Sequence, residues 1–511
     1  MNFSYTVNFN EVIGKNDRFW AAAGIDSLYP IIFTQSGEYL LSRMQEKGTL
    51  RYLRNHFTLS SLIKDGYDDC GGNAYSEDEN GNPIYNFEKM NAVFGQYLKY
   101  GAKPIVEMDF LPNELCRKNV TTGGVEEGRY SNRSYPGDWE KWEDLLRAFT
   151  KNLVDTFGID EVRTWYFEVW NEPDSWPMSD WPMFHRLYDV FVSAVTGVDD
   201  QLKVGGPGAF SLPFMKDFLE HVSNGTNCVT GEKGSRIDFI SYHIYGMSGG
   251  WLDQWPLITP SVQRFIQQLM WLKRMIDVYP CLDGIPVHLN EWGVSSNYEK
   301  TADKFPPLEF RNSEYSPLFM IKLVDCIRKM RRVWNMPLEL MLYWGFSMED
   351  DQKTPFAGHR DLSTCPNIPK PILSAYELLA RLGEDELFVE GAAPGASLGA
   401  MAGRSKNSVQ AIVYNFNDQD FDAAGPCVQA SIAFTGLESG KYTVKRTRLD
   451  KEHHNTYRLW QTGASEEEIR QAAQLTPDEE FELESKEGSI KTQVAIPAHG
   501  LCLIEIQKTH G

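Results

Sequence analysis

The 511-residue chain is predicted to fold as a (β/α)8 TIM barrel followed by an antiparallel β-sandwich domain. From about residue 15 to 383, short strand-like runs alternate with longer helical patterns, which is the order of a parallel sheet. Past Gly383, short alternating runs are separated by Asn, Asp, Gly and Pro, which is typical of an antiparallel sandwich. Residues 15–383 are therefore assigned to the barrel, and residues 1–14 together with 384–511 to the second domain.

Eight segments of the barrel region have the apolar character of buried strands. They are residues 21–24 (the least clearly defined), 50–57, 103–110, 164–170, 203–206, 238–245, 286–292 and 338–346. Helical patterns lie between them at residues 87–100, 138–157, 181–198, 261–278 and 316–334. Gly101 and Gly158 mark helix ends just before a strand. Eight repeated β–α units predict a closed barrel.

The C-terminal region carries short runs in which apolar and polar residues alternate. They are residues 409–416, 428–435, 441–447, 492–496 and 501–506, and one helical piece at 465–473 interrupts them. The first nine residues alternate in the same way and have no role in a barrel. We therefore expect the N-terminus to add a strand to the second domain.

Composition narrows the class of function. The formal charge of -20 argues against nucleic acid and anionic membranes as partners, and the chain has no apolar run long enough for a membrane span. The N-terminus lacks a signal-peptide pattern, although a removed signal would leave no trace. Eight scattered cysteines without a CxxC motif predict no metal site and no disulfide framework. A cytoplasmic protein is expected, and homo-oligomerisation stays open.

The most informative motif is WYFEVWNEPD at residues 165–174. Bulky apolar residues predict a buried strand, which Pro173 must end because proline cannot continue a strand ladder. Glu172 is thereby fixed at the carboxyl end of a strand, where barrel enzymes place their chemistry. Aromatic walls raise the pKa of a carboxyl, which suits a general acid. The alternative is an exposed turn.

A second carboxylate, Glu291, ends another strand-like run, VHLNEW at residues 287–292. It follows Glu172 by 119 residues, about three β–α units, so the two glutamates would close strands 4 and 7. Two carboxyls about 5 Å apart are what a retaining glycosidase needs, one as acid/base and one as nucleophile. Such a pair needs no cofactor. Four further side chains also fall at predicted strand ends, namely His56, His243, Tyr245 and Trp344.

Several motifs together resemble family 39 of the glycoside hydrolases. They are GAKPIVEM at 101–108, WYFEVWNEP at 165–173, KVGGP at 203–207, DFISYH at 238–243 and KPILSAYELL at 370–379, and the resemblance covers nearly the whole chain. It implies a retaining mechanism with Glu172 as acid/base and Glu291 as nucleophile. It also implies that Asn171 binds the sugar 2-hydroxyl. The positions of His56, His243, Tyr245 and Trp344 match sugar subsites.

The substrate is less clearly indicated. Asp351 and Gln352 stand where the family's β-xylosidases carry paired glutamates. Residues 355–360 instead resemble the α-L-iduronidase branch, in which Arg360 would hold a substrate carboxylate through a bidentate pair. Tyr245 stands where that branch has a lysine.

We therefore expect a retaining exo-β-D-xylosidase acting on xylo-oligosaccharides or xylosides. The alternatives are an α-L-iduronidase-like enzyme or another family 39 glycosidase, such as an arabinosidase, β-glucosidase or β-galactosidase. A non-catalytic sugar-binding protein is the remote alternative.

Overall fold

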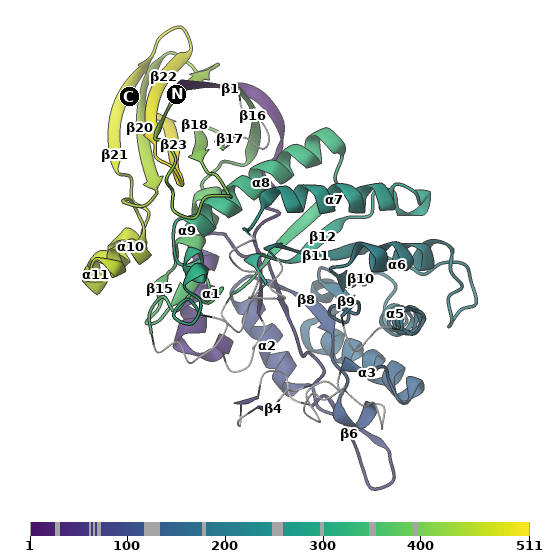
Figure 1. The fold of residues 1–511 in the computed structure, drawn as a ribbon. Coiled ribbons are helices and arrows are strands. Elements are labelled where there is room, and N and C mark those ends of the chain that lie inside the picture. The colour runs from purple at the N-terminus through teal and green to yellow at the C-terminus, as the bar shows by residue number, and fades with distance from the viewer. Residues whose placement is uncertain are drawn as a thin grey trace.

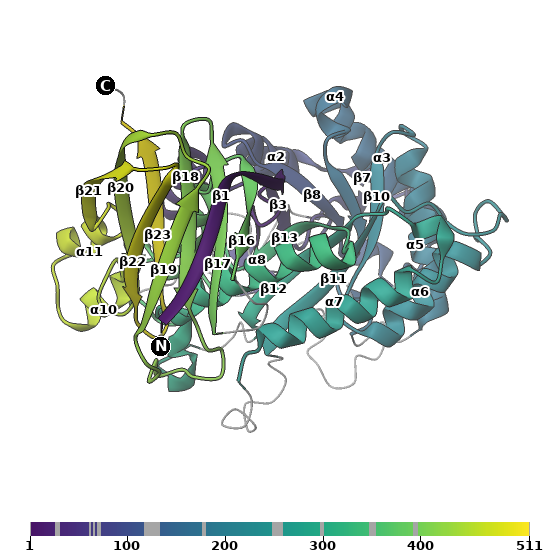
Figure 2. The same cartoon turned by 90° about the horizontal axis from the view of Figure 1, so that it is seen from above.

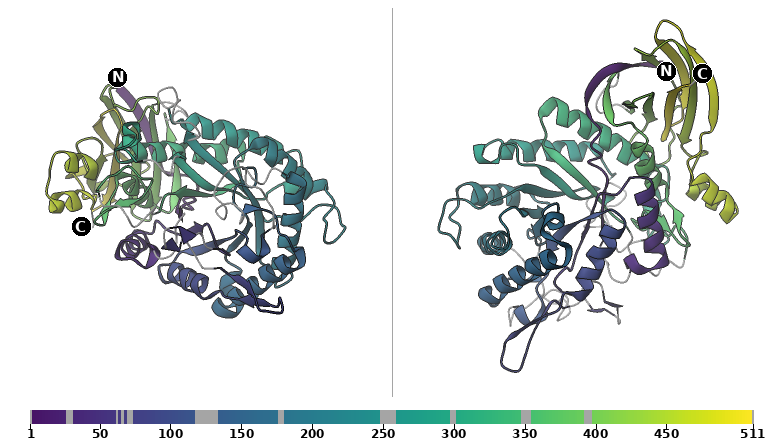
Figure 3. Two further views of the ribbon diagram at one scale, coloured as in Figure 1. Left: turned by 60° about the horizontal axis from the view of Figure 1, so that its bottom comes forward. Right: turned by 180° about the vertical axis from the view of Figure 1, so that it is seen from behind.

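The computed structural model describes residues 2–25, 31–60, 63–64, 67–68, 73–116, 133–175, 180–247, 259–296, 301–346, 354–391 and 397–509. Its larger part is a closed barrel of eight parallel strands, surrounded by helices (Figures 1 and 3). In chain order the strands are β2 (Ala22–Ile25), β3 (Tyr52–Asn55), β8 (Lys103–Met108), β9 (Tyr166–Val169), β10 (Lys203–Ala209), β11 (Phe239–Met247), β12 (Val287–Ser295) and β13 (Leu338–Trp344). The predicted barrel is confirmed.

Helices surround the barrel. They are α1 (Gln35–Glu46), α2 (Glu88–Lys99), α3 (Trp139–Phe157), α4 (Ile159–Val162), α5 (Trp181–Thr196), α6 (Leu212–Asn224), α7 (Val262–Ile276), α8 (Tyr315–Trp334) and α9 (Pro371–Ala380). Both α8 and α9 are buried on nearly every side. The described residues also form the 3-10 turns η1 (Ile31–Phe33), η2 (Asn113–Leu115), η5 (Pro280–Leu282) and η6 (Pro306–Arg311). Asp138 starts α3 by accepting the backbone N–H groups of Glu140 and Lys141. Among the described helices, none is both long and apolar enough to span a bilayer.

Short two-stranded antiparallel sheets lie in the loops of the barrel. They are β4 (Ile63–Lys64) with β5 (Tyr67–Asp68), β6 (Tyr75–Glu77) with β7 (Pro83–Tyr85), and β14 (Ser363–Thr364) with β15 (Ile368–Pro369).

The second domain is a mostly antiparallel nine-stranded sheet. Its strands are β1 (Asn2–Lys15), β16 (Asp385–Glu390), β17 (Leu398–Ser405), β18 (Ser408–Asn415), β19 (Val428–Thr435), β20 (Gly440–Leu449), β21 (Glu479–Ser485), β22 (Ser489–Ile496) and β23 (Gly500–Lys508). The order β21-β20-β23-β18-β17-β16-β1-β19-β22 is continuous, and β1 pairs parallel to β19. Arg446 on β20 donates to the Gln493 carbonyl of β22, so the two ends of the sheet come close together, and the sheet encloses an apolar core. Helices α10 (Thr456–Gln461) and α11 (Glu466–Ala472) follow β20.

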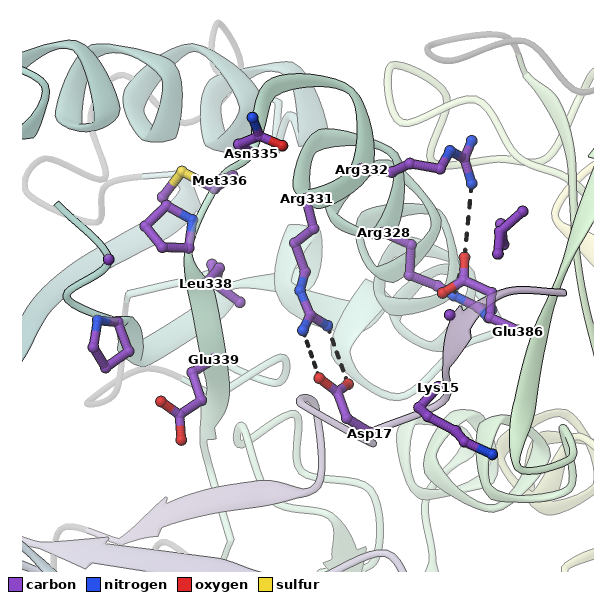
Figure 4. Close-up of a pocket in the computed structure, with 15 residues that line it drawn as sticks. Lys15, Asp17, Arg328, Arg331, Arg332, Asn335, Met336, Leu338, Glu339 and Glu386 are labelled. Atoms are coloured by element: carbon purple, nitrogen blue, oxygen red, sulfur yellow. Dashed lines mark hydrogen bonds and ion pairs between the residues drawn. The ribbon is translucent and has the colours of Figure 1, made fainter.

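The sheet packs along α8 of the barrel (Figure 2). Tyr414 of β18 donates a hydrogen bond to Asp325 of α8 at 2.7 Å. A cavity of about 590 Å³ lies at this junction, at the amino-terminal end of the barrel strands (Figure 4). Ion pairs cross it: Arg331 of α8 pairs with Asp17, and the Arg328 Nε lies 3.1 Å from Glu386 Oε1. These pairs tie the N-terminal segment and β16 to the barrel, on the face opposite the site described below.

Candidate active site

Glu172 is held at the carboxyl end of β9 by an unusual backbone. The strand ends at Val169, and both Trp170 (φ 65°) and Glu172 (φ 46°) adopt the left-handed conformation, which is uncommon for residues other than glycine. The Glu172 N–H donates to the Gly208 carbonyl at 2.9 Å, which fixes it to the end of β10. Such conformations cluster at functional sites. Glu172 is the more exposed of the two glutamates, with 27% of its side chain accessible.

Asp174 secures the loop that follows. Its carboxylate accepts the backbone N–H groups of Phe210 and Ser211, at 3.0 and 2.6 Å. Burial and the nearby charge of Glu172 raise the pKa of Asp174 to about 7. The loop that carries Glu172 is thus fastened to the adjacent loop after β10.

Glu291 lies within β12, three barrel strands beyond β9, and only 8% of its side chain is accessible. Its Oε1 accepts the Tyr245 hydroxyl at 2.7 Å. Its Oε2 lies 3.5 Å from the Arg54 guanidinium and 3.9 Å from the His56 ring. Hydrogen bonds and a cation around a carboxylate favour its charged form, which is the nucleophilic form.

His243 of β11 lies between the two glutamates. Its Nδ1 is 3.0 Å from Glu172 Oε1 and 3.6 Å from Glu291 Oε2. Burial lowers the pKa of His243 to about 4, so the ring is neutral near pH 7. With carboxylate oxygens beside Nδ1, and no hydrogen-bond partner at Nε2 among the described residues, we assign the proton to Nδ1. One oxygen of each glutamate and a His243 ring nitrogen all lie within 4.8 Å of one another.

The buried guanidinium of Arg54 contacts several side chains of the site. Arg54 of β3 has no accessible surface and contacts Glu107 at 2.5 Å and Glu168 at 2.6 Å. Its Nη2 donates to the Asn171 Oδ1 at 3.2 Å, which orients that amide. Gly208 leaves room for the ion pair of Arg54 with Glu168, because a Cβ at residue 208 would lie 3.2 Å from Glu168 Oε1.

The roles of Arg54, Glu107 and Glu168 were not predicted from the sequence. The signal that could have revealed them is a charged residue inside an apolar strand, since such a residue needs a buried partner. Burial raises the pKa of Glu107 to about 8, although the Arg54 charge opposes this shift. Glu107 also lies 2.9 Å from the His56 Nδ1, so it links two neighbouring strand ends.

Trp344 ends β13 and packs against His56 and Arg54 of the site. Its ring lies 4.3 Å from the His56 ring, centroid to centroid, and the Arg54 guanidinium lies over it at 5.2 Å. Gly24 on the paired strand β2 makes this possible, because a Cβ there would lie 2.0 Å from a Trp344 ring carbon. The structure thus places Trp344 next to His56, and His243 and Tyr245 next to Glu291.

Arg360 also reaches the site, in a way that the sequence did not indicate. It is 4% exposed, and its Nη1 donates to the Tyr245 hydroxyl at 2.7 Å. The Arg360 guanidinium thus binds a side chain of the protein itself, whereas a substrate carboxylate was expected there. Asp351 lies outside the described residues.

Two groups have the spacing of a divalent-cation site, Glu172 with His243 and Glu291, and His56 with Glu107 and Asp109. In both groups the residues already contact one another. Arg54 also supplies positive charge next to Glu107 and Glu291. The arrangement is that of two carboxyls with different surroundings, one partly open and hydrogen-bonded to a neutral imidazole, the other enclosed by donors.

Comparison with known proteins agrees with this geometry. The profile of glycosyl hydrolases family 39 matches residues 6–480. A β-xylosidase from Geobacillus stearothermophilus is 26% identical over 532 residues, covering 98% of this chain and 94% of its own. The α-L-iduronidase of Canis lupus familiaris is 34% identical over 192 residues, covering 35% of this chain and 28% of its own.

The crystal structure of a monomeric β-xylosidase from Caulobacter crescentus CB15 has a TM-score of 0.79 at 24% identity. The alignment covers 99% of this chain and 100% of that one. The fold is therefore shared over the full length of both proteins. The chain belongs to family 39 of the glycosyl hydrolases and is an enzyme that hydrolyses glycosidic bonds.

Proposed function

We propose that this enzyme is a retaining exo-glycosidase of the β-D-xylosidase type, with Glu172 as acid/base and Glu291 as nucleophile. The observation that carries the proposal is the short separation of the two carboxyls, whose nearest oxygens lie within 4.8 Å. Retaining glycosidases place these groups about 5–5.5 Å apart, whereas inverting enzymes need about 6.5–9.5 Å to admit a water molecule.

The surroundings of each glutamate suit its proposed role. Glu291 attacks the anomeric carbon while Glu172 protonates the leaving oxygen, which gives a covalent glycosyl-enzyme. Glu172 then removes a proton from water, and that water displaces Glu291. The enclosed Glu291 accepts a hydrogen bond from Tyr245 and lies beside Arg54, which suits a charged nucleophile, whereas the more accessible Glu172 can exchange protons with leaving group and water.

Asn171 is proposed to bind the sugar, and Trp344 to support the site from behind. Arg54 donates to the Asn171 oxygen, so the amide NH2 remains to donate to a sugar hydroxyl such as the 2-hydroxyl. The Trp344 ring is 1% exposed and packs against His56 and Arg54, so it supports the sugar site from behind these two residues. These contacts suit a neutral pentose, in keeping with the β-xylosidase relatives aligned over the whole chain.

One observation favours a second candidate, an α-L-iduronidase-like activity. Arg360 brings a buried positive charge next to Tyr245, at the side of the site. A uronic acid would place its carboxylate near such a charge. The bond between Arg360 and Tyr245 favours the neutral sugar, because a substrate carboxylate would have to displace it.

Hydrolysis of a panel of nitrophenyl glycosides tests the proposal. The β-D-xyloside is expected to be cleaved fastest, and preference for an α-L-iduronide would select the second candidate. Glu291→Gly should abolish turnover, and azide should restore it with formation of a glycosyl azide of inverted configuration. Near-normal turnover by Glu291→Gly without azide would refute the proposed role of Glu291.

A further inference from the structure

A chain of two hydrogen bonds joins Arg360 to Glu291 through Tyr245. Arg360 Nη1 donates to the Tyr245 hydroxyl at 2.7 Å, and that hydroxyl donates to Glu291 Oε1 at 2.7 Å. The three residues come from different parts of the barrel: Tyr245 from β11, Glu291 from β12, and Arg360 from the segment after β13. All three side chains are buried.

The main chain holds Arg360 in place for this contact. The Tyr343 hydroxyl donates to the Arg360 carbonyl at 2.8 Å, and Lys370 Nζ donates to the preceding carbonyl, that of His359, at 2.7 Å. Gly345 permits the approach, since a Cβ there would lie 2.4 Å from the Arg360 oxygen. The guanidinium is therefore directed by a fixed backbone.

Tyr245 is confined in the same way. It faces Gly293 in the register of β11 and β12, and a Cβ on Gly293 would lie 2.9 Å from a Tyr245 ring carbon. The Arg360 guanidinium also lies 5.5 Å from the centre of the Tyr245 ring. The hydroxyl proton of Tyr245 can turn about the C–O bond, so a cation on one side of the oxygen decides where that proton points.

The charge on Arg360 has a definite effect on this proton. A guanidinium has only donors, so the Tyr245 oxygen must accept from it, and the hydroxyl proton turns toward Glu291. A hydroxyl that accepts a charged hydrogen bond becomes a stronger donor. The carboxylate of Glu291 is stabilised in consequence, and its Oε1 is fixed, which orients the Oε2 that lies toward His243 and Glu172.

We propose that Arg360 is a positioning residue that acts through Tyr245, directing the hydroxyl proton of that residue onto the nucleophile. The inference rests on the proposed role of Glu291. When Glu291 attacks, the bond from Glu291 to the anomeric carbon forms as the bond to the leaving oxygen breaks. When water displaces Glu291, the electron pair returns to its carboxylate, which Tyr245 and Arg360 then stabilise.

A double-mutant cycle in the full-length enzyme tests this coupling. Arg360→Met, Tyr245→Phe and the double variant are compared through the pH profile of kcat/KM on an aryl β-D-xyloside. Arg360→Met should lower kcat/KM about ten-fold and move the acidic limb upward, because Glu291 loses support for its charged form. Tyr245→Phe should lower it about a hundred-fold. The double variant should match Tyr245→Phe alone, because the hydrogen-bond path from Arg360 to Glu291 runs through that hydroxyl.

Arg360→Lys serves as the conservative variant and should recover part of the loss, with the acidic limb moving back toward that of the parent. Losses that multiply in the double variant would overturn the inference, as would a loss confined to uronides. If Arg360→Met fails to fold, the cycle of Arg360→Lys with Tyr245→Phe gives the same test. Glu291→Gly is measured in parallel. If this variant is active without azide, the proposed function fails. If it is inactive, additive losses in the double variant contradict only the coupling of Arg360 to Glu291.

Discussion

Replacing His243 with Phe should move the alkaline limb of activity to higher pH. In the parent, the neutral His243 donates its Nδ1–H to Glu172 Oε1 at 3.0 Å. This hydrogen bond stabilises the charged form of Glu172 and so lowers the pKa at which the general acid is lost. Phe preserves a ring of similar shape and removes the donor.

The size of the shift follows from the burial of the two partners. A hydrogen bond to a charged group contributes about 1.5–3 kcal/mol when it is buried. The His243 side chain has no accessible surface, but 27% of the Glu172 side chain is accessible, so water replaces part of the lost interaction. About 1.4 kcal/mol then remains, which corresponds to roughly one pH unit.

The pH profile of kcat/KM on an aryl glycoside measures this shift. His56→Phe is the matched control, because the His56 ring lies 3.9 Å from Glu291 and its Nδ1 contacts Glu107 at 2.9 Å. It should leave the alkaline limb in place. An alkaline limb of His243→Phe that is unchanged, or that moves to lower pH, would refute the assignment of the proton to Nδ1.

Three further changes probe stability. Arg54→Met should destabilise the protein by about 3–5 kcal/mol in urea unfolding, because Glu107 and Glu168 lose a buried partner. His288→Phe should stabilise it by about 2 kcal/mol at pH 5: burial lowers the pKa of His288 to about 3, so the parent loses stability as pH falls from about 6.5 toward 3. Glu386→Gln should cost about 1.5–3 kcal/mol, because Arg328 is 5% exposed.

Each of these results has a clear contrary outcome. Arg54→Met with unchanged stability would contradict the burial of that network. A His288→Phe variant that gains as much stability at pH 8 as at pH 5 would show that protonation of the imidazole is not the cause. The control for Glu386→Gln is Asp155→Asn, which breaks a surface pair with Lys151 and should change stability by less than about 0.5 kcal/mol.

The two glutamates were predictable from the sequence because a parallel barrel brings all carboxyl ends of its strands to one face. Glu172 follows a strand of large apolar residues and precedes a proline, which is a local signal. The place where β9 ends was not predictable. It stops one residue before the predicted end because Trp170 turns left-handed, and that conformation depends on packing in three dimensions.

The partners of buried charges could not be read from the sequence. Arg54 meets Glu107, Glu168 and Glu291 only because β3, β8, β9 and β12 belong to one closed barrel. The contact from Arg360 to Tyr245 spans 115 residues. Sequence resemblance indicated a positive charge at that place, but its orientation depends on Tyr343, Gly345 and Lys370.

The anomeric configuration of the first-formed sugar tests the central claim most directly. The claim is that two carboxyls within 4.8 Å act as nucleophile and acid/base in a double displacement. Proton NMR during hydrolysis of an aryl β-D-xyloside resolves the product before it mutarotates. We predict that β-xylose appears first and α-xylose only later. Release of α-xylose first would show inversion and contradict the account.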